Sequence, residues 1–204
     1  FDLALDAAFE KVVKDIKDNL HKNINLYAEA ITADMNKPIS QSIAEVEKCA
    51  LLCDYYIDNV ADFLEPQFIK TKWNQSYVTF EPLGVLLGVM PWNFPFWQVF
   101  RFVIPSLLLG NTFVLKHASN VPKSARLLED VFNSKNIDFP IYQNLFLKSN
   151  DIESIIAHKN IKAVSLTGSE NAGRSVAEIS GKKKKKCVLE LGGSNAYIVL
   201  KDAD

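Results

Sequence analysis

The sequence has little cysteine: its 204 residues contain only Cys49, Cys53 and Cys187. Three thiols are too few for the disulfide framework of a small secreted domain, and their number is odd. The count favours a reducing compartment, so we expect a cytoplasmic protein. Cys49 and Cys53 lie about one helical turn apart with no further ligand cluster nearby, which favours buried packing thiols over a metal or redox pair. No metal site is predicted.

An excess of charge of either sign is also lacking. The chain has 23 Lys and Arg against 24 Asp and Glu, a formal net charge of −1. This balance gives no reason to expect nucleic acid or an anionic membrane as a partner. The single low-complexity segment, five lysines at 182–186, is interpreted as a solvated helix end in preference to a polyanion site.

A long uninterrupted apolar run is absent as well. The stretch 83–109 has the length of a membrane span, but Asn93, Gln98, Arg101 and three prolines interrupt it. A spanning helix tolerates such a set poorly, so we expect no membrane segment. No charged segment followed by an apolar one begins at Phe1, so no signal peptide is expected.

What is present is an ordinary globular composition, 48% hydrophobic and 23% charged, in a length that suits one domain or one domain with a small appendage. Residues 1–64 are expected to be helical. Between Ile39 and Val60 apolar residues recur at steps of four and three, the pattern of one helix face. Pro38 marks the start of that helix after a break at 35–38. Residues 65–82 form a small excursion with a strand at 77–80.

From Leu83 onward, β-rich runs alternate with helical segments. Strands are expected at 84–90, 112–116, 144–147, 163–167, 187–191 and 196–200, and helices at 96–109, 122–133, from 151, and at 171–180. Alternation of this kind implies crossover connections and parallel pairing. The predicted fold class is α/β, an open Rossmann-like, mainly parallel sheet with flanking helices.

Unusual residues fall where the predicted strands end, which is the edge at which such sheets bind ligands. Asn93 sits in a proline-braced turn after the first strand, where its amide is either an oxyanion donor or a structural group. Lys116 ends the second strand ahead of Ser119. Alone, a lysine in that position is more often a solvated strand terminus.

Two further groups follow later strands. Gly168 and Ser169 lead into a helix, where small residues let backbone N–H groups approach a phosphate. Glu190 closes an apolar strand before Gly192 and Gly193. A carboxylate among apolar neighbours is often a tuned acid or base, although a strand-end Glu that reaches solvent explains it equally well without the glycines.

Read in order, these segments resemble the aldehyde dehydrogenase superfamily. The resemblance is carried by Glu81-Pro82-Leu83-Gly84-Val85, Pro91-Trp92-Asn93-Phe94-Pro95, Gly110-Asn111, Leu166-Thr167-Gly168-Ser169, Glu190-Leu191-Gly192-Gly193 and Asp202-Ala203-Asp204. Details around Ile43–Cys49, Phe96–Arg101 and Lys116–Ser119 look most like bacterial succinate-semialdehyde dehydrogenases.

The resemblance implies roles for individual residues. Asn93 matches the side-chain oxyanion donor and Glu190 the general base of the family's catalytic machinery, and Arg101 matches an arginine that binds a substrate carboxylate. A helix-surface arginine is the alternative for Arg101. The positions that match the nicotinamide dinucleotide site are Trp92, Asn93, Lys116, His117, Ala118, Ser119, Gly168, Ser169 and Leu191.

The cofactor is expected to be NAD or NADP. Strongly NAD-specific relatives carry a glutamate where this chain has Ser119, and a serine removes the repulsion of a 2′-phosphate. Lys116 is then expected to pair with that phosphate.

The family's nucleophilic cysteine follows the Glu-Leu-Gly-Gly segment, and Cys187 precedes Glu190. We therefore expect residues 1–204 to be an incomplete cofactor-binding domain, inactive alone, without the catalytic domain. In the complete enzyme, residues 65–82 would belong to the region that builds a homodimer or homotetramer. The alternative is a naturally short, non-catalytic nucleotide-binding or interaction module.

Overall fold

The computed structural model describes residues 3–133 and 140–203, with side chains from residue 8 onward. Asp204, the last residue of one motif quoted above, lies outside the described residues. The elements are α1 Leu3–Lys22, α2 Ile24–Met35, α3 Ile39–Leu64, β1 Gln67–Phe68, β2 Tyr77–Val78, β3 Val85–Met90, α4 Trp97–Leu108, β4 Thr112–His117, α5 Pro122–Phe132, β5 Tyr142–Asn144, the 3-10 turn η1 Ser149–Asp151, α6 Ile152–Ala157, β6 Ile161–Gly168, α7 Glu170–Lys182 and β7 Lys186–Leu191.

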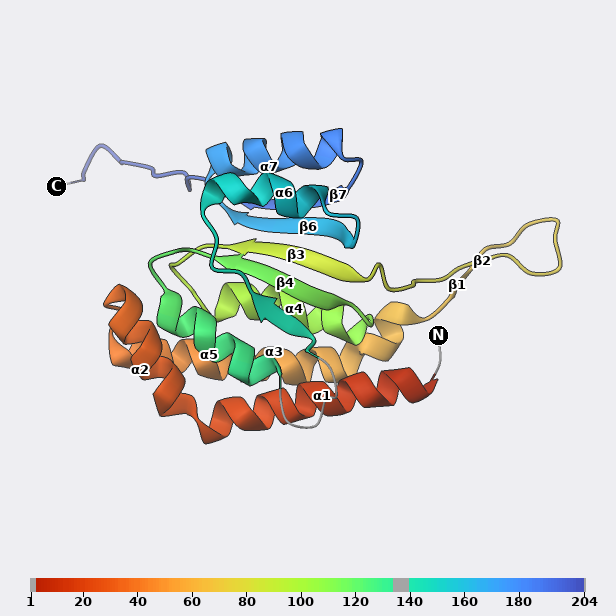
Figure 1. Cartoon of the computed structure of the whole chain (residues 1–204), viewed down its shortest axis with the longest axis horizontal. Coiled ribbons are helices and arrows are strands. Elements are labelled where there is room, and N and C mark those ends of the chain that lie inside the picture. Colours follow the sequence, from red (N-terminus) through yellow and green to blue (C-terminus); the bar gives the residue numbers. More distant parts are fainter. Residues whose placement is uncertain (1–2, 134–139, 204) are drawn as a thin grey trace.

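The predicted parallel sheet is confirmed. Five strands pair in parallel in the order β5-β4-β3-β6-β7, so the chain starts at the central strand, builds outward to β5, then crosses back to β6. Helices α6 and α7 cover one face, whereas α4 and α5, backed by α1 to α3, cover the other (Figure 1). This is the doubly wound order, with its switch point between β3 and β6.

Two apolar cores hold the layers together. The larger lies between the sheet and helices α1 to α5 and includes the fully buried Phe96, Phe100 and Phe132; the smaller, around Leu87, Val164 and Leu166, lies beneath α6 and α7. Gly88 sits in the middle of β3, where an added Cβ would come within 2.9 Å of both Leu115 and Phe102. The central strand therefore allows α4 to pack close to the sheet.

The predicted long helix is confirmed as α3, and Cys49 and Cys53 are both fully buried on its apolar face. Burial raises the pKa of both thiols, that of Cys53 to about 12, so they remain protonated at neutral pH. The interpretation as packing thiols is confirmed.

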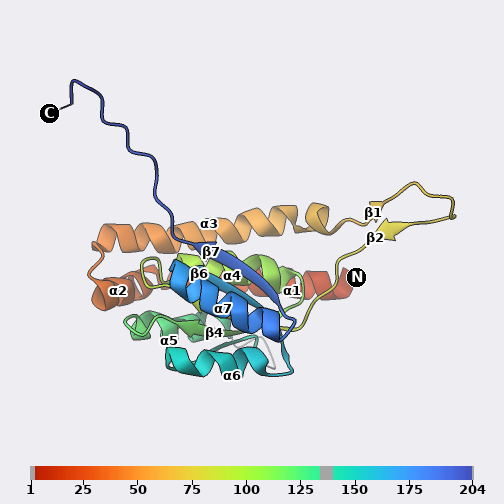
Figure 2. The ribbon, with the colours of Figure 1, turned by 90° about the horizontal axis from the view of Figure 1, so that it is seen from above.

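Residues 65–82 form an arm that leaves the body on the side where β3 begins (Figures 1 and 2). Its two short antiparallel strands, β1 and β2, pair Gln67 with Val78 and Phe68 with Tyr77. Large apolar side chains remain exposed along it, including Phe68 at 73% and Trp73 at 70%. The strand expected at 77–80 is present but stops at Val78.

The predicted strand at 196–200 is wrong. Residues 192–200 have no helix or strand, and Tyr197 and Ile198 are 91% and 80% exposed. The run has strand-like composition, but no neighbouring strand pairs with it in the described structure, and composition alone does not make a strand. Strand β5, Tyr142–Asn144, begins two residues before its predicted start, because Tyr142 and Asn144 align with Phe113 and Leu115 of β4.

The lysine run is only in part a solvated helix end. Helix α7 ends at Lys182, and Lys186 already belongs to β7. Between them, the Lys185 ammonium donates to the carbonyl oxygens of His158 and Ile161 at 2.5 and 2.6 Å. Lys185 therefore ties the α7–β7 turn to the start of β6.

None of the helices in the ranges 3–133 and 140–203 has the length and apolarity that crossing a bilayer requires.

His117 at the end of β4 is buried and fixes the loop that follows β3. Its Nδ1 accepts from the Ala118 N–H at 2.9 Å, so Nε2 carries the proton and donates to the Pro95 carbonyl, also at 2.9 Å. Burial lowers the pKa of His117 from 6.5 to about 4, with smaller opposing contributions from the Pro95 carbonyl and Asp34 and a further lowering from Lys116. The ring is therefore neutral in the folded protein at neutral pH.

This burial predicts an acid-sensitive stability. Between pH 6.5 and 4 the unfolded chain binds a proton that the folded chain excludes, so the contribution of His117 is complete above pH 6.5 and lost as the pH falls through about 4. The loss amounts to about 3 kcal/mol by the linkage relation. Urea unfolding across this range should show a shallower acid slope for His117→Gln. His21→Gln, at an exposed position, should keep the parent slope. An unchanged slope for His117→Gln would contradict the assignment.

Gly173 in α7 predicts a second, packing-based effect. A Cβ at Gly173 would come within 2.4 Å of Leu191 Cδ2, whereas one at Gly181 in the same helix meets nothing within 4 Å. Alanine at Gly181 should stabilise the protein by about 0.5 kcal/mol through helix propensity. Alanine at Gly173 should instead destabilise it by about 1 kcal/mol, because Leu191 must move. Adding Leu191→Ala should cancel much of that loss. Equal stabilisation at both glycines would show that the overlap has no energetic consequence.

Candidate functional site

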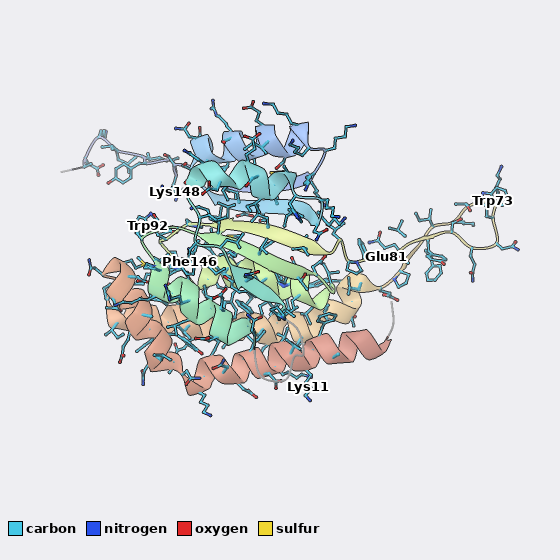
Figure 3. The ribbon with its side chains drawn as sticks, in the orientation of Figure 1. Lys11, Trp73, Glu81, Trp92, Phe146 and Lys148 are labelled. Carbon is cyan, nitrogen blue, oxygen red and sulfur yellow. The ribbon has the colours of Figure 1, made fainter. Side chains whose placement is uncertain are left out.

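The carboxyl ends of all five strands lie at one edge of the sheet, because the strands are parallel. Figure 3 shows Trp92, Phe146 and Lys148 at this edge, on the side from which the C-terminal segment leaves, far from Trp73 on the arm. Open α/β sheets bind ligands here, next to the switch point. The site residues predicted from the sequence are therefore gathered along one edge, although not in a single pocket.

The first hollow lies between α4 and strands β3, β6 and β7 and runs along the sheet, from Leu83 and Lys186 near the amino ends of the strands to the carboxyl ends. It has a volume of about 290 Å³, and its lining includes Met90, Arg101, Phe102, Thr167 and Glu190. The guanidinium of Arg101 donates to Glu190 Oε2 at 3.1 Å and to Gln98 Oε1 at 3.3 Å. The structure thus brings the predicted substrate-binding and general-base residues together in one mostly apolar hollow.

The structure agrees with the interpretation of Glu190 as a strand-end carboxylate that reaches solvent. Strand β7 is the edge strand of the sheet, so the Glu190 side chain is 52% exposed and that of Arg101 39%. An ion pair this exposed contributes little to stability. Both side chains are available to a ligand that offers a better partner.

A second hollow of about 250 Å³ lies between the loop after β4 and the segment after β5. His117, Ala118 and Ser119 line it on one side, and Asn144 and Lys148 on the other. The amide of Asn144 is buried, yet both of its side-chain polar atoms lack a partner among the described residues. An unpartnered buried amide is costly unless a bound group satisfies it, so this hollow suits a polar ligand.

Lys116 and His117 make contacts that the sequence did not predict. The Lys116 ammonium is half-buried, burial lowers its pKa, and it donates to the His117 carbonyl at 3.3 Å. The His117 ring is occupied by the backbone on both nitrogens, so only its main chain remains for a ligand. Lys148 lines the hollow with Ser119, and the sequence reasoning missed it because the sequence alone does not show that the segment after β5 lies beside the loop after β4.

The N-termini of the crossover helices are not equivalent. Carboxylates from other elements occupy two of them: Glu45 accepts from the first N–H groups of α4, and Asp34 from Lys123 N and Ser124 N of α5. Helix α7 has its own Ser169, whose hydroxyl accepts from Ala172 N at 3.3 Å. Glu170 lies in the first turn of α7 but pairs with Arg174, and no carboxylate from another element accepts from this N-terminus among the described residues. The N–H groups beside Gly168 therefore remain suited to a phosphate.

Trp92 and Asn93 lie on the loop after β3, outside both hollows. Both are exposed, Trp92 at 50%, and the Asn93 side-chain amide makes no hydrogen bond within the described part of the chain. Leu191, 42% exposed, closes β7 and packs on Gly173. A rigid loop with a free amide donor thus borders an apolar hollow that holds a guanidinium and a carboxylate.

Known proteins are similar to this chain in sequence and in fold. The chain is 46% identical over 187 residues to a probable NADP(+) succinate-semialdehyde dehydrogenase of Synechocystis sp., covering 92% of this chain and 41% of that protein. It is 48% identical over 177 residues to an NADP(+) succinate-semialdehyde dehydrogenase of Deinococcus radiodurans, covering 87% and 37%. The structure of succinic semialdehyde dehydrogenase from Streptococcus pyogenes in complex with NADP+ superimposes with a TM-score of 0.92 at 38% identity, covering 100% of this chain and 44% of that one.

The chain thus spans about two fifths of the length of the curated relatives it matches. The model of the aldehyde dehydrogenase family matches residues 9–204. The fold, the carboxyl-edge site and this match agree, and the chain belongs to the aldehyde dehydrogenase family.

Proposed function

We propose that this chain is the cofactor-binding part of a dehydrogenase that oxidises succinate semialdehyde to its carboxylate with NADP+ or NAD+. The observation that carries the proposal is the guanidinium of Arg101, set beside Glu190 in a mostly apolar hollow next to the Asn93 loop. A guanidinium there suits an aldehyde with a second, anionic end. The relatives named as succinate-semialdehyde dehydrogenases support the same substrate.

The chemistry divides among three groups of the complete enzyme. A cysteine thiolate attacks the aldehyde carbon, and the Asn93 amide donates to the oxyanion of the resulting thiohemiacetal. After oxidation to the thioester, Glu190 takes a proton from the water that hydrolyses it. Cys49 and Cys53 are buried protonated thiols and Cys187 is near the start of β7, so the nucleophile must come from outside these 204 residues.

The dinucleotide fits the second hollow and the α7 N-terminus. Gly168 and Ser169 would hold its phosphates at the start of α7, and Ser119, Ala118 and the backbone of His117 would face the adenosine ribose, with the free amide of Asn144 as a further partner. Trp92 and Leu191 would border the nicotinamide, which accepts the hydride from the substrate when the cofactor is bound.

Ser119 and two lysines support tolerance of NADP+. The serine adds no negative charge near a 2′-phosphate, and Lys148 lines the same hollow. Lys116 remains a candidate partner, because its only hydrogen bond in the described structure is to the adjacent carbonyl.

The arm supports an assembly of identical subunits. Its exposed Phe68, Trp73 and Tyr77 form an apolar surface that a monomer would leave in water. A dimer or tetramer of the complete enzyme, in the cytoplasm, is the proposed state.

The substrate is tested with Arg101→Ala in the complete enzyme. The specificity constant kcat/KM for succinate semialdehyde should fall about 10- to 100-fold, the value of one or two charge-assisted hydrogen bonds. For butanal, an uncharged aldehyde of the same chain length, it should stay within about twofold of the parent because Arg101 has no partner on that substrate. Arg174→Ala, an exposed arginine on α7, serves as the control and should leave both constants unchanged.

Equal losses on both aldehydes would reject the carboxylate role of Arg101. A parent enzyme that oxidises neither aldehyde would contradict the proposed function as a whole.

A further inference from the structure

A buried ion pair lies beneath the loop that carries Asn93. The Lys37 ammonium and Glu45 Oε2 are 2.5 Å apart, and the two side chains are only 7% and 0% exposed. Lys37 belongs to the link between α2 and α3, and Glu45 to the second turn of α3. Burying two charges carries a large desolvation cost, and apolar residues of similar volume often stabilise a core as well or better. The pair therefore calls for an explanation beyond stability.

The second oxygen of Glu45 is bound to the start of α4. Glu45 Oε1 accepts from the backbone N–H of Phe96 at 2.9 Å and of Trp97 at 3.0 Å. These are N–H groups that a helix cannot satisfy by itself. A carboxylate is also electrostatically favoured at this end of the helix dipole. Glu45 thus fixes where the β3–α4 loop ends and α4 begins.

Lys37 reaches the loop itself. Its ammonium donates to the main-chain carbonyl of Asn93 at 3.0 Å and lies 3.8 Å from the centroid of the Phe94 ring. Glu45 in turn fixes the ammonium. One ion pair therefore holds the peptide of Asn93, the next side chain and the start of the helix that carries Arg101.

The loop is fastened from a second side by His117, whose Nε2 donates to the Pro95 carbonyl. Held at Asn93, Pro95, Phe96 and Trp97, the loop has its backbone fixed while the Asn93 side chain stays exposed and makes no hydrogen bond within the described residues. An oxyanion donor is most effective when it is held in place before the reaction.

We infer that Lys37 and Glu45 are positioning residues for the Asn93 amide, and that they influence the rate of the chemical step through this residue. The inference rests on the proposed function, because it concerns the same oxyanion. Both side chains are buried beneath the loop, and each acts through the backbone of the loop.

A double-mutant cycle in the complete enzyme tests the inference. Glu45→Gln keeps the shape and one acceptor but removes the charge that holds Lys37, so kcat should fall about tenfold, part of the loss expected for removing an oxyanion donor. The KM for NADP+ should stay within about twofold. In an Asn93→Ala background the same Glu45→Gln change should leave kcat unaltered, because there is no amide left to position.

Two further variants separate misalignment of Asn93 from loss of a helix cap and from loss of folding. Asp34→Asn removes the matched carboxylate from the N-terminus of α5 and should preserve kcat, which separates loss of a helix cap from loss of Asn93 alignment. If Glu45→Gln does not fold, Lys37→Gln leaves the Glu45 bonds to α4 intact, and the same cycle applies. Active-site titration and thermal melts establish the folded fraction of every variant.

The inference is overturned if Glu45→Gln, or Lys37→Gln in its place, lowers kcat by the same factor with and without Asn93, or if the loss matches the folded fraction. It is also overturned if kcat is unchanged in the folded single variant. A parent enzyme without aldehyde turnover would refute the proposed function itself, a result recognised before any variant is made.

Discussion

Parallel pairing of β3 with both of its neighbours is the constraint on which the rest of the structure depends. Because β4 and β6 flank β3 in the same direction, the loops after β3, β4 and β6 must emerge at one edge. The chain leaves that edge to opposite faces, with α4 on one side and α7 on the other (Figure 1). A crevice outside these strand ends follows from the topology, and its chemistry then depends on which side chains the loops present.

Two of those loops are held in place by side chains from other elements. The loop after β3 is held by Glu45 and Lys37 from the helical layer and by His117 from β4. The start of α5 is held by Asp34 of α2. The N-terminal helices therefore do more than cover the sheet: they supply the carboxylates that accept from the N-termini of α4 and α5.

The sequence was sufficient for elements with a strong periodic or punctuated pattern. The stripe of α3, the proline-braced end of β3 and the alternation that gives the parallel sheet all appeared as predicted. The sequence did not predict correctly the strands whose existence or position depends on pairing with a neighbouring strand. Tyr197 and Ile198 have strand composition but no adjacent strand among residues 3–133 and 140–203, and β5 is set by its register with β4. It also missed Lys37, Glu45 and Lys148, because their roles depend on contacts between segments distant in the chain, such as Lys37 with Asn93.

The central claim, that the carboxyl edge of this sheet holds the dinucleotide, is tested most directly by amide hydrogen exchange of the complete enzyme with and without NADP+. The account predicts new protection in the segments 117–120 and 168–173, at the second hollow and the N-terminus of α7. The arm at 65–82 should be unaffected, because it lies on the side where β3 begins (Figure 1). Protection that appears elsewhere and spares both segments would contradict the account.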